Sequence, residues 1–339
     1  MLALWIMSLL LLGAPVQPPD PPPDPNQGQP RAGADQTPPD DEGFRIGVAV
    51  NQVFLSVNVR GPNGFVRDLT ADDFAVFEDG HLQKVVNFYR ERVPVRVVLL
   101  IDISGSTTHT QADIRHAALM FAKSLSPEDQ VAIITFNHQP RLILNWTNKL
   151  EDVQLALESI YARGNTALND AIYVTFDDLL RDVEGKTAVI LLTDGIDTGS
   201  IVSFEEAVDL ALRSDTMVYV VSKLEEYWAQ AIAIRQELQA QARLVPKVLQ
   251  DDYILERKRA LNRLASLTGG RVLDTRSFGR LEDIYAQVAE ELKNQYYLSY
   301  VPSNQNRDGT WREIEVQVAR GGVAVSTRRG YYAPLPSSR

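Results

Sequence analysis

From residue 95 onward, short apolar runs alternate with stretches of helical periodicity, and this alternation limits the fold more than any other feature. The apolar runs have the length and character of strands buried on both faces; they are Val97–Asp102, Gln130–Phe136, Ala188–Asp194 and Met217–Ser222. Helical stretches lie between them, over residues 110–125, 150–160, 167–180 and 204–213. Strands that alternate with helices in this way form a parallel sheet with helices on both faces. We therefore predict an α/β fold with a doubly wound, mostly parallel sheet over residues 94–294.

The segments on either side of this region show the shorter alternation that is typical of antiparallel strands. Residues 44–93 contain three such runs, separated by Pro-Asn-Gly and Glu-Asp-Gly turn signals. Residues 295–333 contain three more, and we expect residues 334–339 to be a short tail. Because neither segment alone buries enough surface to be stable, we predict that they form one antiparallel β-sandwich-like domain into which the α/β domain is inserted. The alternative is two independent hairpin units that pack separately on the α/β domain.

The first 43 residues have a different composition. Leu2–Leu12 is an uncharged apolar stretch, short for a membrane span but suited to the core of a signal peptide, and the small residues Gly13 and Ala14 follow it. Residues 15–43 hold ten of the 18 prolines and few large apolar side chains, which predicts a disordered linker. We expect a signal peptide at residues 1–14 and a secreted, periplasmic or cell-envelope protein. An uncleaved segment would instead anchor the chain to a membrane or belong to its folded part.

Charge and cysteine content exclude several classes of function. The net charge is −10 and no run of Lys or Arg supplies a basic face, which argues against a nucleic-acid partner. The chain has no cysteine, so disulfides, thiolate metal sites and cysteine nucleophiles are excluded. Phosphate-binding glycine loops and a GxSxG nucleophile turn are also missing from the sequence. We therefore expect a protein without catalytic activity.

Polar side chains stand at the ends of two predicted strands and before one predicted helix. Asp102, Ser104 and Ser106 follow the first apolar run, Asp194 ends another, and Thr166 lies in a Gly-Asn turn. Ligands of open parallel sheets bind beyond the carboxyl ends of the strands, so three loops bring oxygen atoms to one crevice. Without a cation, each unpaired buried polar group would cost about 1–3 kcal/mol. A small hard dication, which prefers oxygen ligands, removes this cost.

The combination of "DISGS", Thr166 and "LLTDG" resembles the metal-ion-dependent adhesion site of von Willebrand factor type A (VWA) domains. The signature of that site is DxSxS followed by a separate Thr and a separate Asp. The resemblance extends over roughly residues 94–294, and the flanking segments resemble an exported bacterial family of VWA-related proteins. It implies five metal ligands: the hydroxyls of Ser104, Ser106 and Thr166, with Asp102 and Asp194 held mainly through water.

An inner shell of mostly neutral hydroxyls and water leaves the metal much of its positive charge. The open octahedral position then attracts an anionic oxygen, and the natural source is an Asp or Glu of a protein partner. Mg²⁺ is the first candidate, because it retains water and prefers oxygen contacts of about 2.0–2.1 Å; Mn²⁺ and Ca²⁺ are the alternatives. We predict a metal-dependent, adhesion-type binding module. A scaffold subunit of an envelope complex, with a structural or vestigial metal site, is the second hypothesis, and an accessory to a separate catalytic subunit is the third.

Two features keep other interpretations open. Asp102, Ser104 and Ser106 also suit an N-cap and Asx-turn at the start of the following helix. The nearby acids Asp170 and Asp197 are typical of caps and are left outside the ligand set.

Residues 223–259 form a charged insertion relative to a minimal VWA domain. Its pattern predicts helix broken at Pro246. Trp228, Ile232 and Leu238 are spaced to form one apolar stripe. This stripe either packs on the same domain or binds a partner or a second copy.

Overall fold

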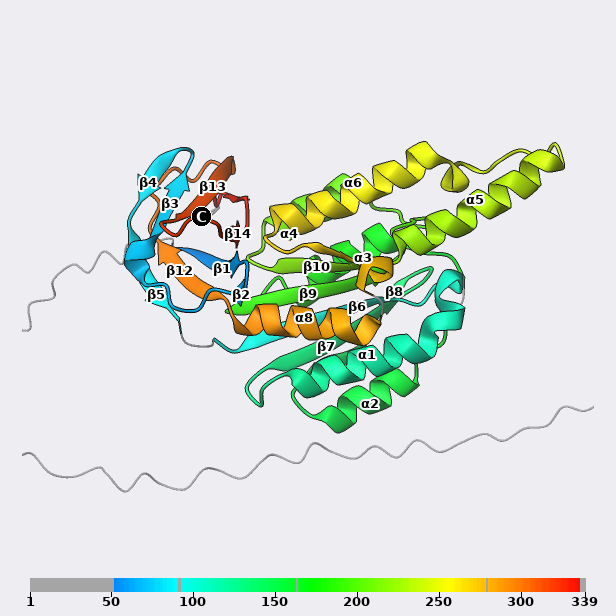
Figure 1. Cartoon of the computed structure of the whole chain (residues 1–339), viewed down its shortest axis with the longest axis horizontal. Helices are drawn as coiled ribbons and strands as arrows, with labels where there is room; N and C mark the ends of the chain where they lie inside the picture. The colour runs from blue at the N-terminus through cyan, green and yellow to red at the C-terminus, as the bar shows by residue number, and fades with distance from the viewer. Residues whose placement is uncertain (1–51, 91–92, 163, 279, 336–339) are drawn as a thin grey trace, which may run out of the picture. The chain divides into compact units, whose positions relative to one another are not determined.

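The computed structural model describes residues 52–90, 93–162, 164–278 and 280–335 (Figure 1). Within these ranges nothing is described of five side chains: Ser106, Thr108, His109, Ser277 and Phe278. The predicted signal peptide (1–14), the predicted linker (15–43) and the last four residues of the predicted tail (334–339) lie outside the described residues. Across the described ranges, no helix combines the length and the apolar character needed to cross a membrane.

The centre of the fold is a six-stranded sheet with the order β11-β10-β9-β6-β7-β8. Its strands are β6 (Val95–Asp102), β7 (Gln130–Phe136), β8 (Pro140–Thr147), β9 (Lys186–Thr193), β10 (Met217–Ser222) and β11 (Val272–Asp274). All neighbours pair in parallel except β7 and β8, which are antiparallel. The prediction of an α/β fold with a largely parallel sheet is confirmed. The edge strand β8 was not predicted; it begins with a proline, which an edge strand tolerates because it has a free side.

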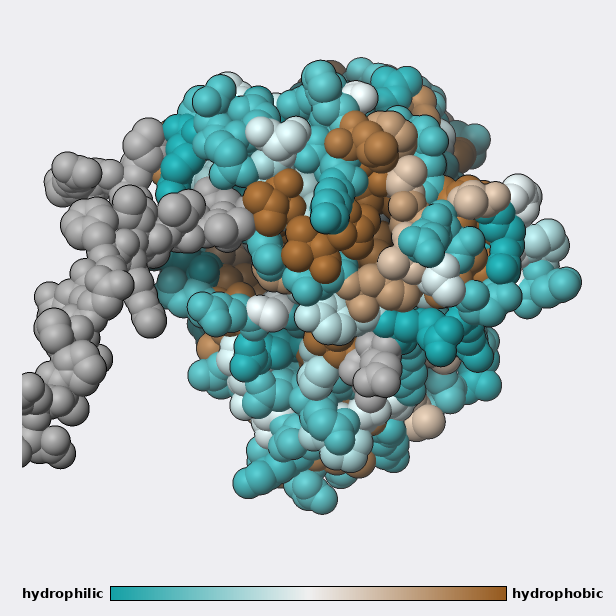
Figure 2. Space-filling view, turned by 90° about the vertical axis from the view of Figure 1, so that its left-hand side faces the viewer, coloured by the Kyte–Doolittle hydropathy of each residue, from teal (hydrophilic) through white to brown (hydrophobic). Residues whose placement is uncertain are grey.

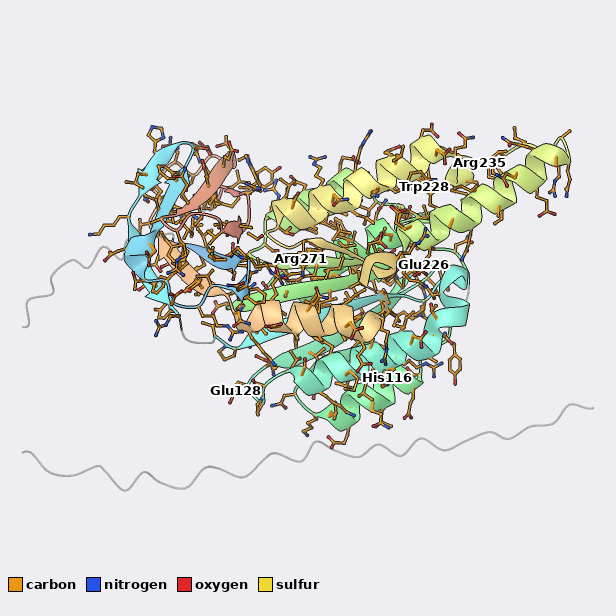
Figure 3. The ribbon with its side chains drawn as sticks, viewed as in Figure 1. His116, Glu128, Glu226, Trp228, Arg235 and Arg271 are labelled. Atoms are coloured by element: carbon orange, nitrogen blue, oxygen red, sulfur yellow. The ribbon has the colours of Figure 1, made fainter. Side chains whose placement is uncertain are left out.

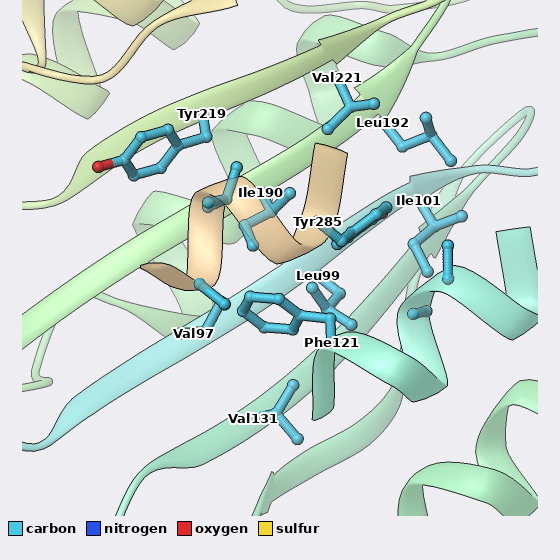
Figure 4. Packing of buried hydrophobic residues seen from close by; sticks show 14 of the residues in the cluster. Val97, Leu99, Ile101, Phe121, Val131, Ile190, Leu192, Tyr219, Val221 and Tyr285 are labelled. Atoms are coloured by element: carbon cyan, nitrogen blue, oxygen red, sulfur yellow. The ribbon is translucent and has the colours of Figure 1, made fainter. Parts of the chain in front are cut away.

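Helices cover both faces of this sheet (Figure 1). They are α1 (Gln111–Ser124), α2 (Leu150–Glu158), α3 (Leu168–Val174), α4 (Phe204–Leu212), α5 (Leu224–Ala240), α6 (Asp251–Leu267), α7 (Thr275–Phe278) and α8 (Leu281–Lys293), with the shorter turns η2 (Gly105–Thr110), η3 (Thr175–Leu179) and η4 (Lys247–Leu249). Val97 and Leu99 of β6 pack towards α1 and α8, where Figure 4 shows the rings of Phe121 and Tyr285. Val98 packs on the opposite face, towards α3, α4 and α6. Because both faces are covered, the strand is a continuous apolar run.

Two antiparallel sheets contain strands from both flanking segments. One has the order β14-β1-β12-β5, with β2 on β1, and the other the order β15-β13-β3-β4. Their strands are β1 (Val53–Gly61), β2 (Gly64–Phe65), β3 (Phe74–Glu78), β4 (His81–Gln83), β5 (Val85–Tyr89), β12 (Tyr296–Tyr300), β13 (Trp311–Val318), β14 (Ala324–Ser326) and β15 (Gly330–Tyr332), with the short turn η1 (Ala71–Asp73) before β3. β1 pairs with β12 and β14, and β3 pairs with β13. Alternate residues of both sheets enter one apolar cluster, so the two segments share a core. The domain boundaries remain a prediction.

Apolar side chains gather in the middle of one otherwise largely hydrophilic face (Figure 2). Three large apolar or aromatic side chains of the antiparallel sheets are exposed. They are Leu82, Val86 and Tyr89, with exposed fractions of 67%, 49% and 47%. They belong to β4 and β5, each of which lies at the edge of its sheet.

The predicted insertion is a helical hairpin made of α5, η4 and α6. The second helix, α6, begins at Asp251 inside the predicted insertion and continues beyond residue 259 to Leu267. On α5, Trp228 and Leu238 pack against a buried cluster, but Ile232 is 39% exposed and lies outside it. The predicted stripe is therefore wrong at Ile232; Ala231 takes the buried position.

Candidate metal centre

Asp102 ends β6 in the middle of the central sheet, and its carboxylate is fully buried. One carboxylate oxygen, Oδ1, accepts a hydrogen bond from the Ser104 amide at 2.9 Å. The other, Oδ2, accepts from the hydroxyl of Thr193, the last residue of β9, at 3.2 Å. The carboxylate therefore joins the ends of two neighbouring parallel strands, at the edge where such sheets bind ligands.

Ser104 and Ser106 lie in the loop that follows β6. Ser104 is 2% exposed, and its carbonyl oxygen accepts hydrogen bonds from the amide and hydroxyl of Thr107 at 3.1 and 2.9 Å. Ser106 lies in η2, and its side chain is outside the described part of the structure. The Gly105 amide donates to the carbonyl oxygen of Gly164 at 3.0 Å. This bond joins the first loop to the loop that carries Thr166.

Thr166 is 6% exposed and lies two residues before α3. Its amide donates to the hydroxyl of Thr198 at 3.0 Å. Its carbonyl oxygen accepts from the amides of Thr198 and Gly199 at 2.9 and 3.0 Å. The backbone of Thr166 is thus fixed on both sides by the loop that follows β9.

Asp194 is the first residue of that third loop and is 5% exposed. Its Oδ1 accepts from the Ile196 amide at 3.0 Å, and the Gly195 amide donates to the Thr193 hydroxyl at 2.9 Å. The chain turns at Gly195, whose φ of 78° favours glycine. The four predicted ligands whose side chains are described, Asp102, Ser104, Thr166 and Asp194, therefore lie on three loops that are hydrogen-bonded to one another.

The electrostatics of the site favour a cation. Burial raises the pKa of Asp102 above its ordinary value, and the nearby carboxylate of Asp194 raises it further; hydrogen bonds from Ser104 and Thr193 oppose this shift. In the described ranges no cluster of three or more His, Cys, Asp or Glu side chains is arranged to hold a metal. The donors gathered here are two carboxylates and neutral hydroxyls. Such oxygen donors fit a hard dication such as Mg²⁺, which would also relieve the repulsion between the two carboxylates.

Asp170 and Asp197 use their carboxylates within the loops. Asp197 Oδ1 accepts from the Leu168 amide at 2.8 Å and from the Ser200 hydroxyl at 2.6 Å. Asp170 Oδ1 accepts from the amides of Ile201 and Val202, both at 2.9 Å. Both carboxylates therefore join the start of α3, just after Thr166, to the loop that follows β9.

Sequence reasoning did not find Thr198 as the partner of Thr166. The signal was present in "TDGIDTGS", because a second threonine and a serine follow Asp194 within six residues of the same loop. Residue type alone did not indicate that one of these hydroxyls would accept a hydrogen bond from a loop 32 residues earlier.

Residues 97–196 match the family model of the von Willebrand factor type A domain, so the chain contains a VWA domain. An uncharacterized protein, sll0103, from Synechocystis is 25% identical over 108 residues, which are 31% of this chain and 26% of that protein. The matched part thus spans about a quarter of that relative.

Solved structures with similarity to this chain include three bacterial proteins. The VWA protein from Catenulispora acidiphila is 12% identical, covers 84% of this chain and 74% of its own, and has a TM-score of 0.44. BatB from Bacteroides thetaiotaomicron is 16% identical over 59% of this chain and 99% of its own, with a TM-score of 0.40. The vWF domain of the type V pili tip protein Mfa5 from Porphyromonas gingivalis is 18% identical over 32% and 40%, with a TM-score of 0.30.

Proposed function

From the VWA domain and the three joined loops, we infer that this chain is an exported, non-enzymatic binding module that presents a divalent cation to a carboxylate of a protein partner. One observation carries the proposal. The buried carboxylate of Asp102 lies close enough to Asp194 for the two negative charges to interact, at the edge of the sheet where ligands bind. A buried pair of like charges is stabilised when a cation lies between them.

The ligands of this cation would be the five side chains that the sequence indicates. Ser104, Ser106 and Thr166 would bind through their hydroxyls, and Asp102 and Asp194 mainly through water. Mg²⁺ suits this set best, with Mn²⁺ and Ca²⁺ as alternatives. When bound, the metal supplies an electrophilic centre that attracts an anionic oxygen. The hydrogen bonds between the three loops would hold these ligands in place around the metal.

A protein side chain is the ligand that this chemistry favours. The net charge of −10 disfavours nucleic acid, and an Asp or Glu of a protein partner supplies the required carboxylate. The apolar segment Leu2–Leu12 and the proline-rich stretch after it support export. A partner would thus be a secreted or cell-envelope protein.

The competing function is a scaffold subunit of an envelope complex whose metal site is structural or vestigial. Both functions use the same fold and the same loops. They differ in whether capture of the partner depends on the metal.

The test is a pull-down of envelope proteins by the chain from residue 44 onward, with Mg²⁺ or with EDTA. Capture that EDTA and Asp102→Ala both abolish supports the binding module. A matched control is Asp72→Ala, which removes an exposed carboxylate in the turn before β3. Capture that persists in EDTA and in Asp102→Ala would overturn metal dependence and favour the scaffold.

A further inference from the structure

The α5–α6 hairpin packs directly on the loop that carries Asp194. Ile196, two residues after Asp194, is 3% exposed and belongs to an apolar cluster with Leu224, Leu249 and Ile254. A Cβ at Gly195 would lie 2.8 Å from Leu261 Cδ1 of α6. The metal loop and the hairpin are therefore in close contact at two consecutive residues.

A hydrogen bond extends this contact to a third residue. The hydroxyl of Tyr253, in the first turn of α6, donates to the carbonyl oxygen of Asp197 at 3.1 Å. The side chain of Asp197 accepts from the Leu168 amide at 2.8 Å, two residues after Thr166. A short chain of hydrogen bonds thus runs from the hairpin, through Asp197, to the second metal loop.

Side-chain contacts also join α5 to the rest of the hairpin. Asp251 at the start of α6 accepts a hydrogen bond from Trp228 Nε1 and pairs with Arg235 Nη1 of α5, both at 2.8 Å. The labelled Trp228 and Arg235 lie on this part of the hairpin in Figure 3. The hydroxyl of Tyr227 donates to the carbonyl oxygen of Val248 at 3.1 Å. These contacts fix the two helices of the hairpin relative to each other, and so fix the surface that packs on the metal loop.

We propose that Tyr253 is a positioning residue for the metal centre: by holding the backbone at Asp197, it fixes the separation of the Thr166 and Asp194 loops and so favours Mg²⁺ over Ca²⁺. The proposal rests on the proposed function, because it requires that the centre bind a divalent cation. Mg²⁺ demands near-ideal octahedral geometry with contacts of about 2.0–2.1 Å, whereas Ca²⁺ accepts about 2.3–2.6 Å and a flexible arrangement. Loops that are held at a fixed separation therefore select the smaller ion.

The insertion then has a role within its own domain. It does not supply a ligand; it restrains the loops that do. The aromatic ring of Tyr253 also lies 5.7 Å from the Arg257 guanidinium and 5.4 Å from Lys247 Nζ. Replacing Tyr253 by Phe keeps the ring packing and removes only the hydroxyl, so this substitution isolates the hydrogen bond to Asp197.

The experiment is to measure the Kd of Mg²⁺ alone and of Ca²⁺ alone for the wild type and for Tyr253→Phe in the full chain. We expect the preference for Mg²⁺ to fall about two- to ten-fold, the range that one hydrogen bond contributes. The matched control is Trp228→Phe, which removes an N–H of the same hairpin that bonds to Asp251 at the start of α6. A wild-type preference in Trp228→Phe and a reduced one in Tyr253→Phe supports the proposal.

Other outcomes overturn it in distinguishable ways. Equal preference in the wild type and Tyr253→Phe, or the same loss in both variants, would show that the bond to Asp197 does not position the loops. Absence of metal binding in the wild type would overturn the proposed function itself. Amide hydrogen exchange at residues 195–199 of the metal-free protein gives a second readout, and we expect it to be faster only in Tyr253→Phe.

Discussion

Thr166 and Thr198 bind each other through two reciprocal hydrogen bonds. The Thr166 amide donates to the Thr198 hydroxyl at 3.0 Å, and the Thr198 amide donates to the Thr166 carbonyl oxygen at 2.9 Å. Thr166 belongs to the second loop of the candidate metal centre, and Thr198 to the loop that begins at Asp194. The position of one predicted ligand is thus set by the loop that carries another.

Replacing Thr198 by Val should weaken metal binding. The substitution removes the acceptor of the Thr166 amide while keeping a side chain of similar shape. One hydrogen bond contributes about 0.5–1.5 kcal/mol, and water replaces part of it at this exposed position, so we expect the Kd of Mg²⁺ to rise about two- to five-fold. Calorimetric titration measures it. Thr198→Ser, which keeps the hydroxyl, should restore the wild-type value; a serine variant as weak as the valine variant would count against this role.

Asp102→Asn should stabilise the metal-free protein at alkaline pH. Burial and the Asp194 carboxylate raise the pKa of Asp102 to about 7. The folded state therefore keeps this proton to a higher pH than the unfolded state, and the stability associated with it is present at low pH and lost as the pH rises towards 7 and above. Asn does not titrate, and its carbonyl can still accept from the Ser104 amide.

The measurement is Tm in EDTA at pH 5 and pH 8. We expect the Tm of Asp102→Asn to be higher than that of the wild type, and this difference in Tm to be several degrees larger at pH 8 than at pH 5. A free-energy change of about 1 kcal/mol corresponds to roughly 2–4 °C in a chain of this size. Added Mg²⁺ should raise Tm in the wild type and not in the variant. A difference between the two proteins that is the same at both pH values would contradict the shifted pKa.

Gly195→Ala should reduce both stability and metal affinity. Gly195 has a φ of 78°, and an added Cβ would lie 2.8 Å from Leu261 Cδ1. The left-handed backbone alone costs about 1–2 kcal/mol. Gly185→Ala is the matched control, because φ is 90° there and nothing lies within 4 Å of an added Cβ. Chemical denaturation should show a loss in both variants, with weaker Mn²⁺ binding only in Gly195→Ala. Unchanged Mn²⁺ affinity in Gly195→Ala would disprove the link between this turn and the ligands.

The two flanking β segments should fold together without the α/β domain. Their strands pair directly, β1 with β12 and β3 with β13, and they fill one apolar cluster. We expect residues 44–93, joined by a short flexible linker to residues 295–333, to show a cooperative thermal transition by circular dichroism. A disordered product that folds only when residues 94–294 are restored would favour two units that depend on the α/β domain.

Periodicity was sufficient to predict most of the strands, and its failures have physical causes. β7 and β10 have the predicted bounds, because each contains a stretch of at least four consecutive apolar residues. β8 was missed, because its residues are only half-buried at the sheet edge and show no clear alternation. The helix predicted over residues 167–180 changes at Thr175 into the wider turn η3. The Thr175 hydroxyl donates to the Ala171 carbonyl oxygen, a contact that often bends helices.

The candidate ligands were predictable and the contacts that hold them were not. Asp102 and Asp194 follow apolar strands, and this pattern is visible in the sequence. Thr198 and Tyr253 act across separations of 32 and 56 residues, and no local pattern encodes such contacts. Similarly, Ala231 rather than Ile232 is buried on α5, in an apolar cluster that includes Ile196 of the metal loop.

The most direct test of a metal centre at these three loops is calorimetric titration of Mg²⁺ or Mn²⁺ into the chain from residue 44 onward. Saturable binding heat and a higher Tm at millimolar ion are expected in the wild type. Asp102→Ala and Thr166→Ala should lose both while still unfolding cooperatively, because the loops lie at the edge of the sheet rather than in its core. A wild-type protein that gives no heat and no metal-dependent change in Tm would contradict the metal centre.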